Sequence, residues 1–415
     1  MKIQFPYGQE SFLDLDFPDE SVLYVHKQEA VENIPLPELS AVVKCALEAP
    51  LNFPPFRESL MNDDHLVIPV APGVPQIGTI LQAVLDYVFS APAEQRPARV
   101  TILQTKTDEE AGLIRSSLED LSPDVQKRVT LTTHRPNKKE EMAFLGVAET
   151  NETLVIHREL FDAESVLPIG FFLPKSTPGH AGIHTAIYPT FSDAETHKRF
   201  KDFGPVLHAA NHALQHELER EVAEATRQLG VLCMLQVVPG VPSPGSSGIA
   251  RILAGDYRDV ELDGYSLYKE IWTSLSKTRS QVVLASVTGQ ESISWYWAMR
   301  ALECASNWAD PNDGAIVLCS DLSGELPRAL EIYREVQALE PTEKIVHREE
   351  LPDAGLMLAG LRVIHNFRVF FVSQIAPDLL EDIGIMPLES AGEVERLVKN
   401  SGSVTLLPDV QRMIF

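Results

Sequence analysis

The sequence predicts an α/β protein of two domains with a cleft between them. Short apolar runs of strand length alternate with segments of helical spacing, which is typical of a largely parallel sheet covered by helices. The chain has 415 residues, too many for one ordinary core, so two domains are expected. Its hydrophobic content of 44% is that of a globular protein able to bury such cores.

The first part of the chain is expected to begin with an antiparallel pair of strands and to continue as alternating strands and helices. The pair comes from the alternating runs KIQF and FLDLDF. Helical spacing follows in LPELSAVVKCALEAP, TILQAVLDYVFSA and DEEAGLIRSSLEDL, the last with acidic residues in its first turn. Strands are expected in HLVIPV, ARVTILQT, RVTLTTH, ETLVIH and VLPIGFFL.

After Pro205 a long helical segment, VLHAANHALQHELEREVAEATRQLG, precedes two strands joined by the loop PGVPSPGSSG. A helix over 265–278 is expected to bridge to a second domain, so that residues 1–264 form the first domain and 279–415 the second. In the second domain QVVLASV, AIVLCS, VFFVSQ and SVTLLP alternate with helices. This rhythm predicts a small doubly wound, Rossmann-like parallel sheet, and ligands usually bind in the crevice of such units.

The composition indicates in which compartment the protein resides and which classes of partner it does not bind. The formal net charge of −24 repels phosphate backbones and anionic lipids, so neither nucleic acid nor a membrane surface is expected as a partner. A site for an acid must therefore hold its own local cations. No apolar run reaches transmembrane length, and the N-terminus is acidic where a signal peptide needs an apolar run. The four cysteines form no CxxC pair. A cytoplasmic protein with reduced thiols is expected.

The stretch PKSTPGHAGIHTAIYP holds His180 and His184 four residues apart. On a helix the two rings would share a face and could bind one metal ion. The glycines and Pro178 make a helix uncertain, and two histidines are too few for a site, so a polar loop is the alternative. A second histidine series, at residues 208, 212 and 216, spans about 12 Å on a helix and cannot bind one ion as a set.

Two further loops could bind anions. THRPNKKEE could hold an acid group through His134 and Arg135, although a plain polar loop is the alternative. PGVPQIGTI follows a strand and precedes a helix, where backbone N–H groups could cradle a phosphate. This loop lacks both nucleotide-binding motifs, GxGxxG and GxxxxGK[ST], and the chain has no GxSxG or HExxH motif. The individual residues therefore predict an α/β protein with a cleft and no particular reaction.

The order of segments resembles the nickel-dependent lactate racemases and their 2-hydroxyacid racemase and epimerase relatives. ALEAPLNFPPF resembles an early family segment, and HLVIPVAPGVPQ stands where the family has a strand ending in Asp-His-Thr-Arg-Pro. PIGFFLPKSTPGHAGIHTAIYP resembles the family's Gly-rich segment with the tether lysine. ELPDAGLMLAGLRVIHNFRVFFVSQIAPDLL and SVTLLPDVQRMIF resemble the last third.

The resemblance implies two α/β domains with the site between them. Family members carry a nickel-pincer nucleotide tethered to a lysine, and two histidines alternate as base and acid while the cofactor accepts a hydride from a hydroxy acid. Two positioned acid–base groups are needed because a proton leaves the hydroxyl on one face and returns from another. A cation must hold the carboxylate.

This sequence departs from the family at those positions. The resemblance places the two catalytic histidines at Asp108 (or Glu109) and Lys175, and the tether lysine at Thr185. The substrate-binding lysine falls on Arg300, which keeps the charge. APGVP offers no cation for a phosphate.

Two other family positions have no direct equivalent. The nickel-binding histidine falls near Lys201, with His197 four residues away, and the covering tryptophan falls on Gly355, although Trp295 and Trp297 could come near by another route. THRPNKKEEMAFLG also resembles a family motif that holds a catalytic histidine. Using His134 in that role would need a large insertion and a matching deletion, so it stays a second reading.

Two hypotheses follow. The first is a divergent, non-catalytic or function-shifted relative that binds a small acidic metabolite or a partner in the cleft. It keeps the cofactor-loop backbone through Gly179, Gly182 and Pro189, and Gly179, Gly182 and His184 are its candidate cofactor-binding residues, but it has no amine at Thr185 to tether the cofactor. The second is an active racemase or epimerase of a 2-hydroxy acid. Asp108 and Lys175 would then be the acid–base pair and Arg300 the carboxylate clamp, while His180 and His184 would contact a metal.

Overall fold

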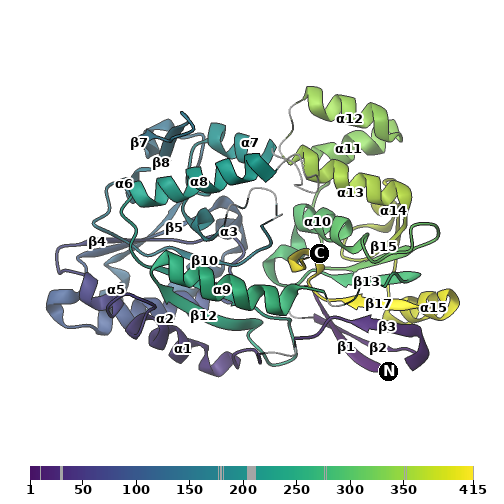
Figure 1. Ribbon diagram of the computed structural model, residues 1–415, viewed down its shortest axis with the longest axis horizontal. Coiled ribbons are helices and arrows are strands. Elements are labelled where there is room, and N and C mark those ends of the chain that lie inside the picture. The colour runs from purple at the N-terminus through teal and green to yellow at the C-terminus, as the bar shows by residue number, and fades with distance from the viewer. Residues whose placement is uncertain are drawn as a thin grey trace.

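The computed structural model of the protein describes residues 1–9, 11–28, 31–175, 177, 180, 182–202, 212–274, 276, 278–349, 351 and 353–414. Two α/β parts lie beside each other, one around the strands labelled β4 to β12 and one around β13 to β17 (Figure 1). The predicted α/β class is confirmed. Over the described ranges, no helix combines the length and apolar character that crossing a membrane requires.

The first part contains a parallel sheet of order β6-β5-β4-β9 and a second sheet of order β10-β11-β12. An isolated bridge between Val70 and Ile169 connects the two sheets. Pairing is parallel between β10 and β11 and antiparallel between β11 and β12, as expected for two strands joined by a Pro/Gly/Ser loop. The strands are β4 (His65–Pro69), β5 (Arg99–Gln104), β6 (Val129–Thr133), β9 (Ser165–Val166), β10 (Ile169–Phe171), β11 (Met234–Pro239) and β12 (Ile249–Gly255).

Helices cover these sheets, and two of them differ from the expected bounds. The segment DEEAGLIRSSLEDL forms two helices, α3 (Lys106–Ala111) and α4 (Leu113–Glu119), because Gly112 adopts a left-handed φ of 72° between them. The expected 265–278 helix is α9 (Tyr257–Trp272), which starts earlier and ends at the buried Trp272. The others are α1 (Leu39–Glu48), α2 (Ile77–Ser90), α5 (Pro123–Gln126), α6 (Arg158–Phe161), α7 (Ala194–Asp202) and α8 (His212–Gln228), with the hairpin β7 (Met142–Val147) and β8 (Thr153–His157) beside α8.

The second part is a six-stranded parallel sheet of order β16-β15-β14-β13-β17-β3. From β13 (Val282–Ser286) the chain moves outward through β14 (Ala315–Cys319), β15 (Arg368–Val372) and β16 (Ile385–Pro387). It then returns to the other side of β13 as β17 (Val404–Leu407). The expected doubly wound sheet is therefore confirmed, with its switch point between β13 and β17. Its helices are α10 (Trp295–Ala305), α11 (Arg328–Val336), α12 (Leu339–Arg348), α13 (Ala354–Asn366), α14 (Pro377–Glu381) and α15 (Ala391–Ser401).

The N-terminal strands belong with this second part and correct the expected range 1–264. β3 (Val22–Val25) pairs in parallel with β17 and extends the sheet. The hairpin of β1 (Lys2–Tyr7) and β2 (Ser11–Asp16) buries Phe5 and Leu13 in one cluster with apolar residues of β13 and β17. Strand patterns are local, whereas the choice of sheet depends on which edge is open, so the sequence could not assign these strands to a sheet.

Helices α10 and α13, which form part of one wall of the cleft, pack closely against each other, and a substitution at their contact can test this packing. A methyl group at Gly360 of α13 would lie 2.3 Å from the sulfur and 2.9 Å from the Cβ of Met299 on α10. The Met299 Cβ cannot yield without moving the helix. We expect Gly360→Ala to lower the free energy of unfolding by about 1–3 kcal/mol, although alanine favours a helix.

The matched control is Gly392→Ala in the first turn of α15, where an added methyl meets nothing within 4 Å. This change should stay within about 0.5 kcal/mol. Urea unfolding followed by circular dichroism measures both variants, and equal effects would contradict the close packing of α10 on α13.

Candidate functional site

A cavity of about 800 Å³ lies between the two parts. The first part contributes the loop after β4, the start of α3, the loop after β6 and the segment around η6 (Ile183–Ala186). The second part contributes η8 (Gly289–Ile293), the start of α10 and Asp353 before α13. The loops after β4, β5, β6 and β13 leave the carboxyl ends of parallel strands, which is where α/β folds place their ligands.

Among the residues that the structure describes, three cations line the cavity. They are Lys106 at the first position of α3 and Arg135 and Lys138 in the loop after β6. Each pairs with a glutamate that does not line it, at 3.3 Å for Lys106 and Glu110, 3.6 Å for Arg135 and Glu109, and 2.7 Å for Lys138 and Glu141. Half-exposed pairs of this kind contribute little stability, so the cations can turn to an anion in the cavity at small cost.

Two histidines stand near these cations. His134 Nε2 donates to the Ser192 carbonyl at 2.8 Å, and His197 Nε2 donates to the Thr190 carbonyl at 3.1 Å. Carbonyls only accept, so both rings carry their proton on Nε2. Burial lowers the pKa of His134 to about 3, helped by His197 and His157, whose ring centroids lie 5.7 and 5.5 Å away. His134 is therefore neutral at pH 7 and offers Nδ1 as an acceptor.

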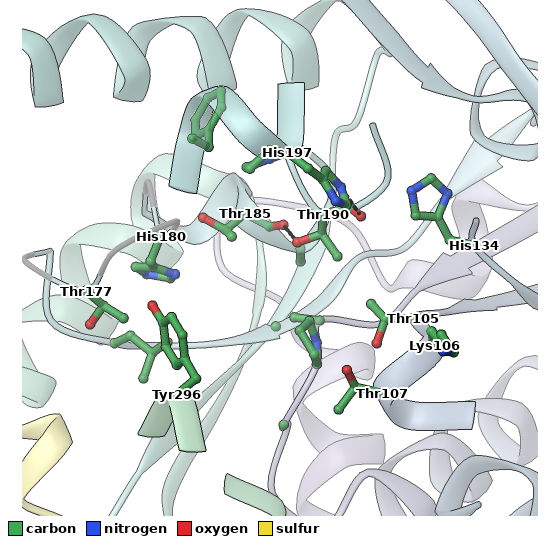
Figure 2. A pocket seen from close by; sticks show the side chains of 18 of the residues that line it. Thr105, Lys106, Thr107, His134, Thr177, His180, Thr185, Thr190, His197 and Tyr296 are labelled. Atoms are coloured by element: carbon green, nitrogen blue, oxygen red, sulfur yellow. Dashed lines mark hydrogen bonds between the residues drawn. The ribbon is translucent and has the colours of Figure 1, made fainter. Parts of the chain in front are cut away.

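Thr177, His180 and Tyr296 line the other end of the cavity, as Figure 2 shows. Between the two ends, the Thr185 hydroxyl donates to the Gly182 carbonyl at 2.8 Å. Trp297 of α10 also lines the cavity, whereas Trp295 packs into the core beside Phe371.

The structure places Asp108 in a helix cap. Its carboxylate accepts from the Thr105 backbone N–H at 3.3 Å, while its own N–H donates to the Thr105 hydroxyl at 3.4 Å, which makes a capping box. The Thr105 hydroxyl also donates to the Asp108 carboxylate at 2.6 Å. Burial raises the pKa of Asp108, although hydrogen bonds from Thr105 and from the Gly73 backbone oppose this. Asp108 thus holds Thr105 and Gly73, which line the cavity, but does not line it itself.

Lys175 and Arg300 also lie outside the lining. Lys175 Nζ is 3.7 Å from Glu261 and 3.9 Å from Glu219, and lies over the Tyr265 ring. Arg300 is fully buried in α10, where it pairs with Glu303 at 2.7 Å. The structure therefore does not bring Asp108, Lys175 and Arg300 together.

Of the candidate residues in the loop around 179–184, some line the cavity and others do not. Gly182, with φ of 82°, and His180 line the cavity. His184 is buried against the Tyr257 ring, 5.0 Å between centroids, and Gly179 lies outside the described residues. In the described ranges no group of three or more His, Cys, Asp or Glu side chains could hold a metal ion. Of the helical histidine series, position 208 lies outside those ranges, and His216 is exposed and 3.5 Å from Glu219.

Comparisons with known proteins agree with this architecture. The Lactate racemase N-terminal domain family matches residues 7–202. The lactate racemase of Thermoanaerobacterium thermosaccharolyticum is 20% identical over 98% of this chain and 97% of its own. The apoprotein structure of that enzyme superimposes with a TM-score of 0.72 at 18% identity, covering 100% of this chain and 99% of the other.

A Thermotoga maritima protein matches with a TM-score of 0.61 at 10% identity, covering 91% of this chain and 97% of its own. These similarities define a two-part α/β fold shared along the whole length. The chain is therefore lactate-racemase-like: residues 7–202 match that family's N-terminal domain, and the fold resembles that of the enzyme along the whole length.

The residues present do not fit a tethered nickel-pincer nucleotide. By the resemblance, the tether position is Thr185, whose hydroxyl bonds to a carbonyl of its own loop and is no substitute for a lysine amine. The loop at Ala71–Gly73, which stands in place of the family's phosphate-contacting arginine, lines the cavity without a cation. No step of a mechanism is therefore derived through that group.

Sequence reasoning missed Lys106, Tyr296 and Glu291 as lining residues. The sequence pattern could have indicated Lys106, because this lysine lies just after a buried strand of a parallel sheet and is the first residue of the next helix. No such pattern indicated Glu291, since its position depends on contacts with Gln411 and Arg412, about 120 residues further along the chain.

The buried His134 predicts a loss of stability in acid. The folded protein keeps this ring neutral down to about pH 3, whereas the unfolded chain takes up a proton near pH 6.5. The unfolded state gains the proton first as the pH falls, so stability present above pH 6.5 is lost below it. We expect His134→Gln to reduce the stability lost between pH 7 and pH 5 by about 1–2 kcal/mol.

Urea unfolding at the two pH values gives this difference directly. His347→Gln on the surface of α12 serves as the control for removing an imidazole. An unchanged pH dependence in His134→Gln would show that the ring is not held neutral.

Proposed function

We propose that this lactate-racemase-like protein is a function-shifted relative that binds a small acidic metabolite in the cavity, without the tethered cofactor of the family. One observation carries the proposal: Lys106, Arg135 and Lys138 line the cavity, whereas the tether position there holds Thr185. The site thus offers charge for an anion but no amine for the covalent link.

The charge distribution supports an acidic ligand. The chain as a whole carries −24 and repels anions at long range. Three cations at one cavity wall oppose that field locally, and the neutral His134 adds a hydrogen-bonding group without adding repulsion. A volume of about 800 Å³ admits a metabolite and its first waters.

The alternative is a racemase with Asp108 and Lys175 as the acid–base pair. The placement of these side chains does not support it. Asp108 is committed to its helix cap and Lys175 to its two glutamates, and neither lines the cavity. Arg300 is buried elsewhere with Glu303. The described lining residues support recognition of an acid and not acid–base exchange by that pair.

Lys106→Ala tests the recognition of a carboxylate. We expect the Kd of lactate, measured by isothermal titration calorimetry, to rise at least tenfold, because a hydrogen bond to a charged group contributes about 1.5–3 kcal/mol. Binding should also weaken with added salt.

Lys344→Ala is a matched control, since Lys344 forms the same i,i+4 pair with Glu340 at 2.7 Å on α12, away from the cavity. Equal affinities of the two variants, or binding unaffected by either, would refute the assignment of the carboxylate to this wall.

The absence of an amine at Thr185 predicts an unmodified chain. Produced in cells that make the nickel-pincer nucleotide, the purified protein should have the intact mass of its sequence and contain no stoichiometric nickel. The lactate racemase of Thermoanaerobacterium thermosaccharolyticum produced in the same cells is the positive control. A covalent adduct mapped to any residue of this chain would overturn the prediction.

A further inference from the structure

The charged residues that line the cavity are divided by sign between its walls. In the described lining, the basic residues Lys106, Arg135 and Lys138 all come from the first part. The acidic residues Glu291 and Asp353 both come from the second part. A ligand that spans the cavity therefore meets positive charge at one wall and negative charge at the other.

Glu291 presents an unsatisfied acceptor at this second wall. Its side chain is buried, with the residue 3% exposed. Oε2 accepts from Gln411 at 2.9 Å and pairs with Arg412 at 3.0 Å. Oε1 has no hydrogen-bond partner in the described structure. It lies 3.7 Å from where a Cβ of Gly73 would stand on the opposite wall, so this oxygen faces the junction of the two parts.

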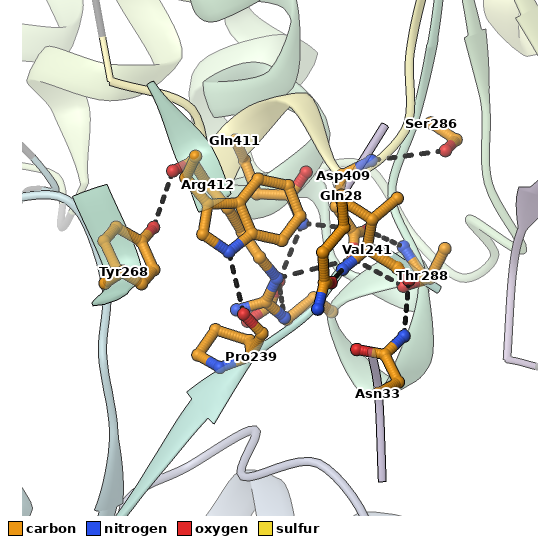
Figure 3. A network of polar contacts seen from close by, with 12 residues as sticks. Gln28, Asn33, Pro239, Val241, Tyr268, Ser286, Thr288, Asp409, Gln411 and Arg412 are labelled. Atoms are coloured by element: carbon orange, nitrogen blue, oxygen red, sulfur yellow. Dashed lines mark hydrogen bonds and ion pairs between the residues drawn. The ribbon is translucent and has the colours of Figure 1, made fainter. Parts of the chain in front are cut away.

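Contacts with Gln411 and Arg412 fix the position of Glu291. Both residues belong to a network at the switch point of the second sheet that also includes Thr288 and Asp409 (Figure 3). Asp409, after β17, accepts from the backbone and hydroxyl of Thr288, after β13, at 2.7 and 2.8 Å. Asp409 also pairs with Arg412 at 3.4 Å, and Arg412 in turn holds Glu291. The free oxygen is thus held rigidly in place before any ligand arrives, which reduces the entropy lost on binding.

An unpaired buried carboxylate oxygen costs stability that a ligand donor would restore. A cationic donor restores most, because its hydrogen bond is charge-assisted. Burial raises the pKa of Glu291 to about 7, against the attraction of Arg412 and together with Asp409. Glu291 in turn contributes to the raised pKa of Tyr268 of α9 and of Tyr296 of α10. A cation at Oε1 would favour the ionised form and release a proton on binding.

We propose that the ligand of this cavity is a zwitterion of the α-amino acid class. Its carboxylate lies at the wall of Lys106, Arg135 and Lys138, and its ammonium group donates to Oε1 of Glu291. This inference rests on the proposed function, since it takes the carboxylate wall from there and adds the second wall.

The test compares acids that differ only in the amino group. Titration calorimetry of the full-length protein uses three pairs, namely alanine and lactate, phenylalanine and phenyllactate, and glutamate and 2-hydroxyglutarate. At least one amino acid should bind tenfold more tightly than its hydroxy partner. Glu291→Gln should abolish that preference, because a neutral amide does not attract an ammonium group as a carboxylate does.

Glu303→Gln is the matched control, because Glu303 is also buried and paired with an arginine but does not line the cavity. It should keep the preference. In the unmodified protein the affinity for the preferred amino acid should rise up to tenfold from pH 6 to pH 8, because the ionised Glu291 is the binding form. This pH series remains a test even if Glu291→Gln does not fold.

The outcomes separate the two proposals. Hydroxy acids that bind as tightly as their amino partners, or an affinity for amino acids that is independent of pH, would overturn the zwitterion while leaving the proposed function intact. If no acid of any pair binds, both proposals fail.

Discussion

The ion pairs of Arg412 are the interaction on which the rest of the structure depends. This buried guanidinium contacts Glu291 and Asp409 and lies over the ring of Phe171 in β10, 5.4 Å from its centroid. The backbone carbonyl of Arg412 accepts from Tyr268 of α9. One residue near the C-terminus therefore joins the switch point of the second sheet to a strand and a helix of the first part. Losing one partner of such a group would leave a buried charge unpaired, which costs several kcal/mol.

That junction decides the character of the cavity. It brings the carboxyl ends of strands from both sheets to one place and fixes an acidic wall opposite a basic one. The fold resembles that of lactate racemase along the whole chain, and a scaffold can keep its shape when side chains in its site change. Threonine at position 185 offers no amine for a tether, and the loop at Ala71–Gly73 lines the cavity without a cation.

The three residues that sequence comparison placed at catalytic and substrate positions show how local geometry redirects chemical groups. Asp108 turned inward to cap α3, Lys175 turned to Glu219 and Glu261, and Arg300 entered the core of α10 with Glu303. In each of the three, the charge is used for a contact within the fold. A charged residue at the position of a functional residue can take over its role only if its side chain points in the same direction as the side chain that it replaces.

The sequence by itself determined the α/β class, the strands β13, β14, β15 and β17, the likeness to lactate racemases, and the lack of an amine at Thr185. These follow from local apolar patterns, segment order and residue identity, which need no three-dimensional information. Only the tertiary structure decided that β3 extends the second sheet, that Lys106 lines the cavity and that Glu291 faces it. Side-chain direction and long-range strand pairing depend on contacts between segments hundreds of residues apart, and no local pattern encodes which of those contacts forms.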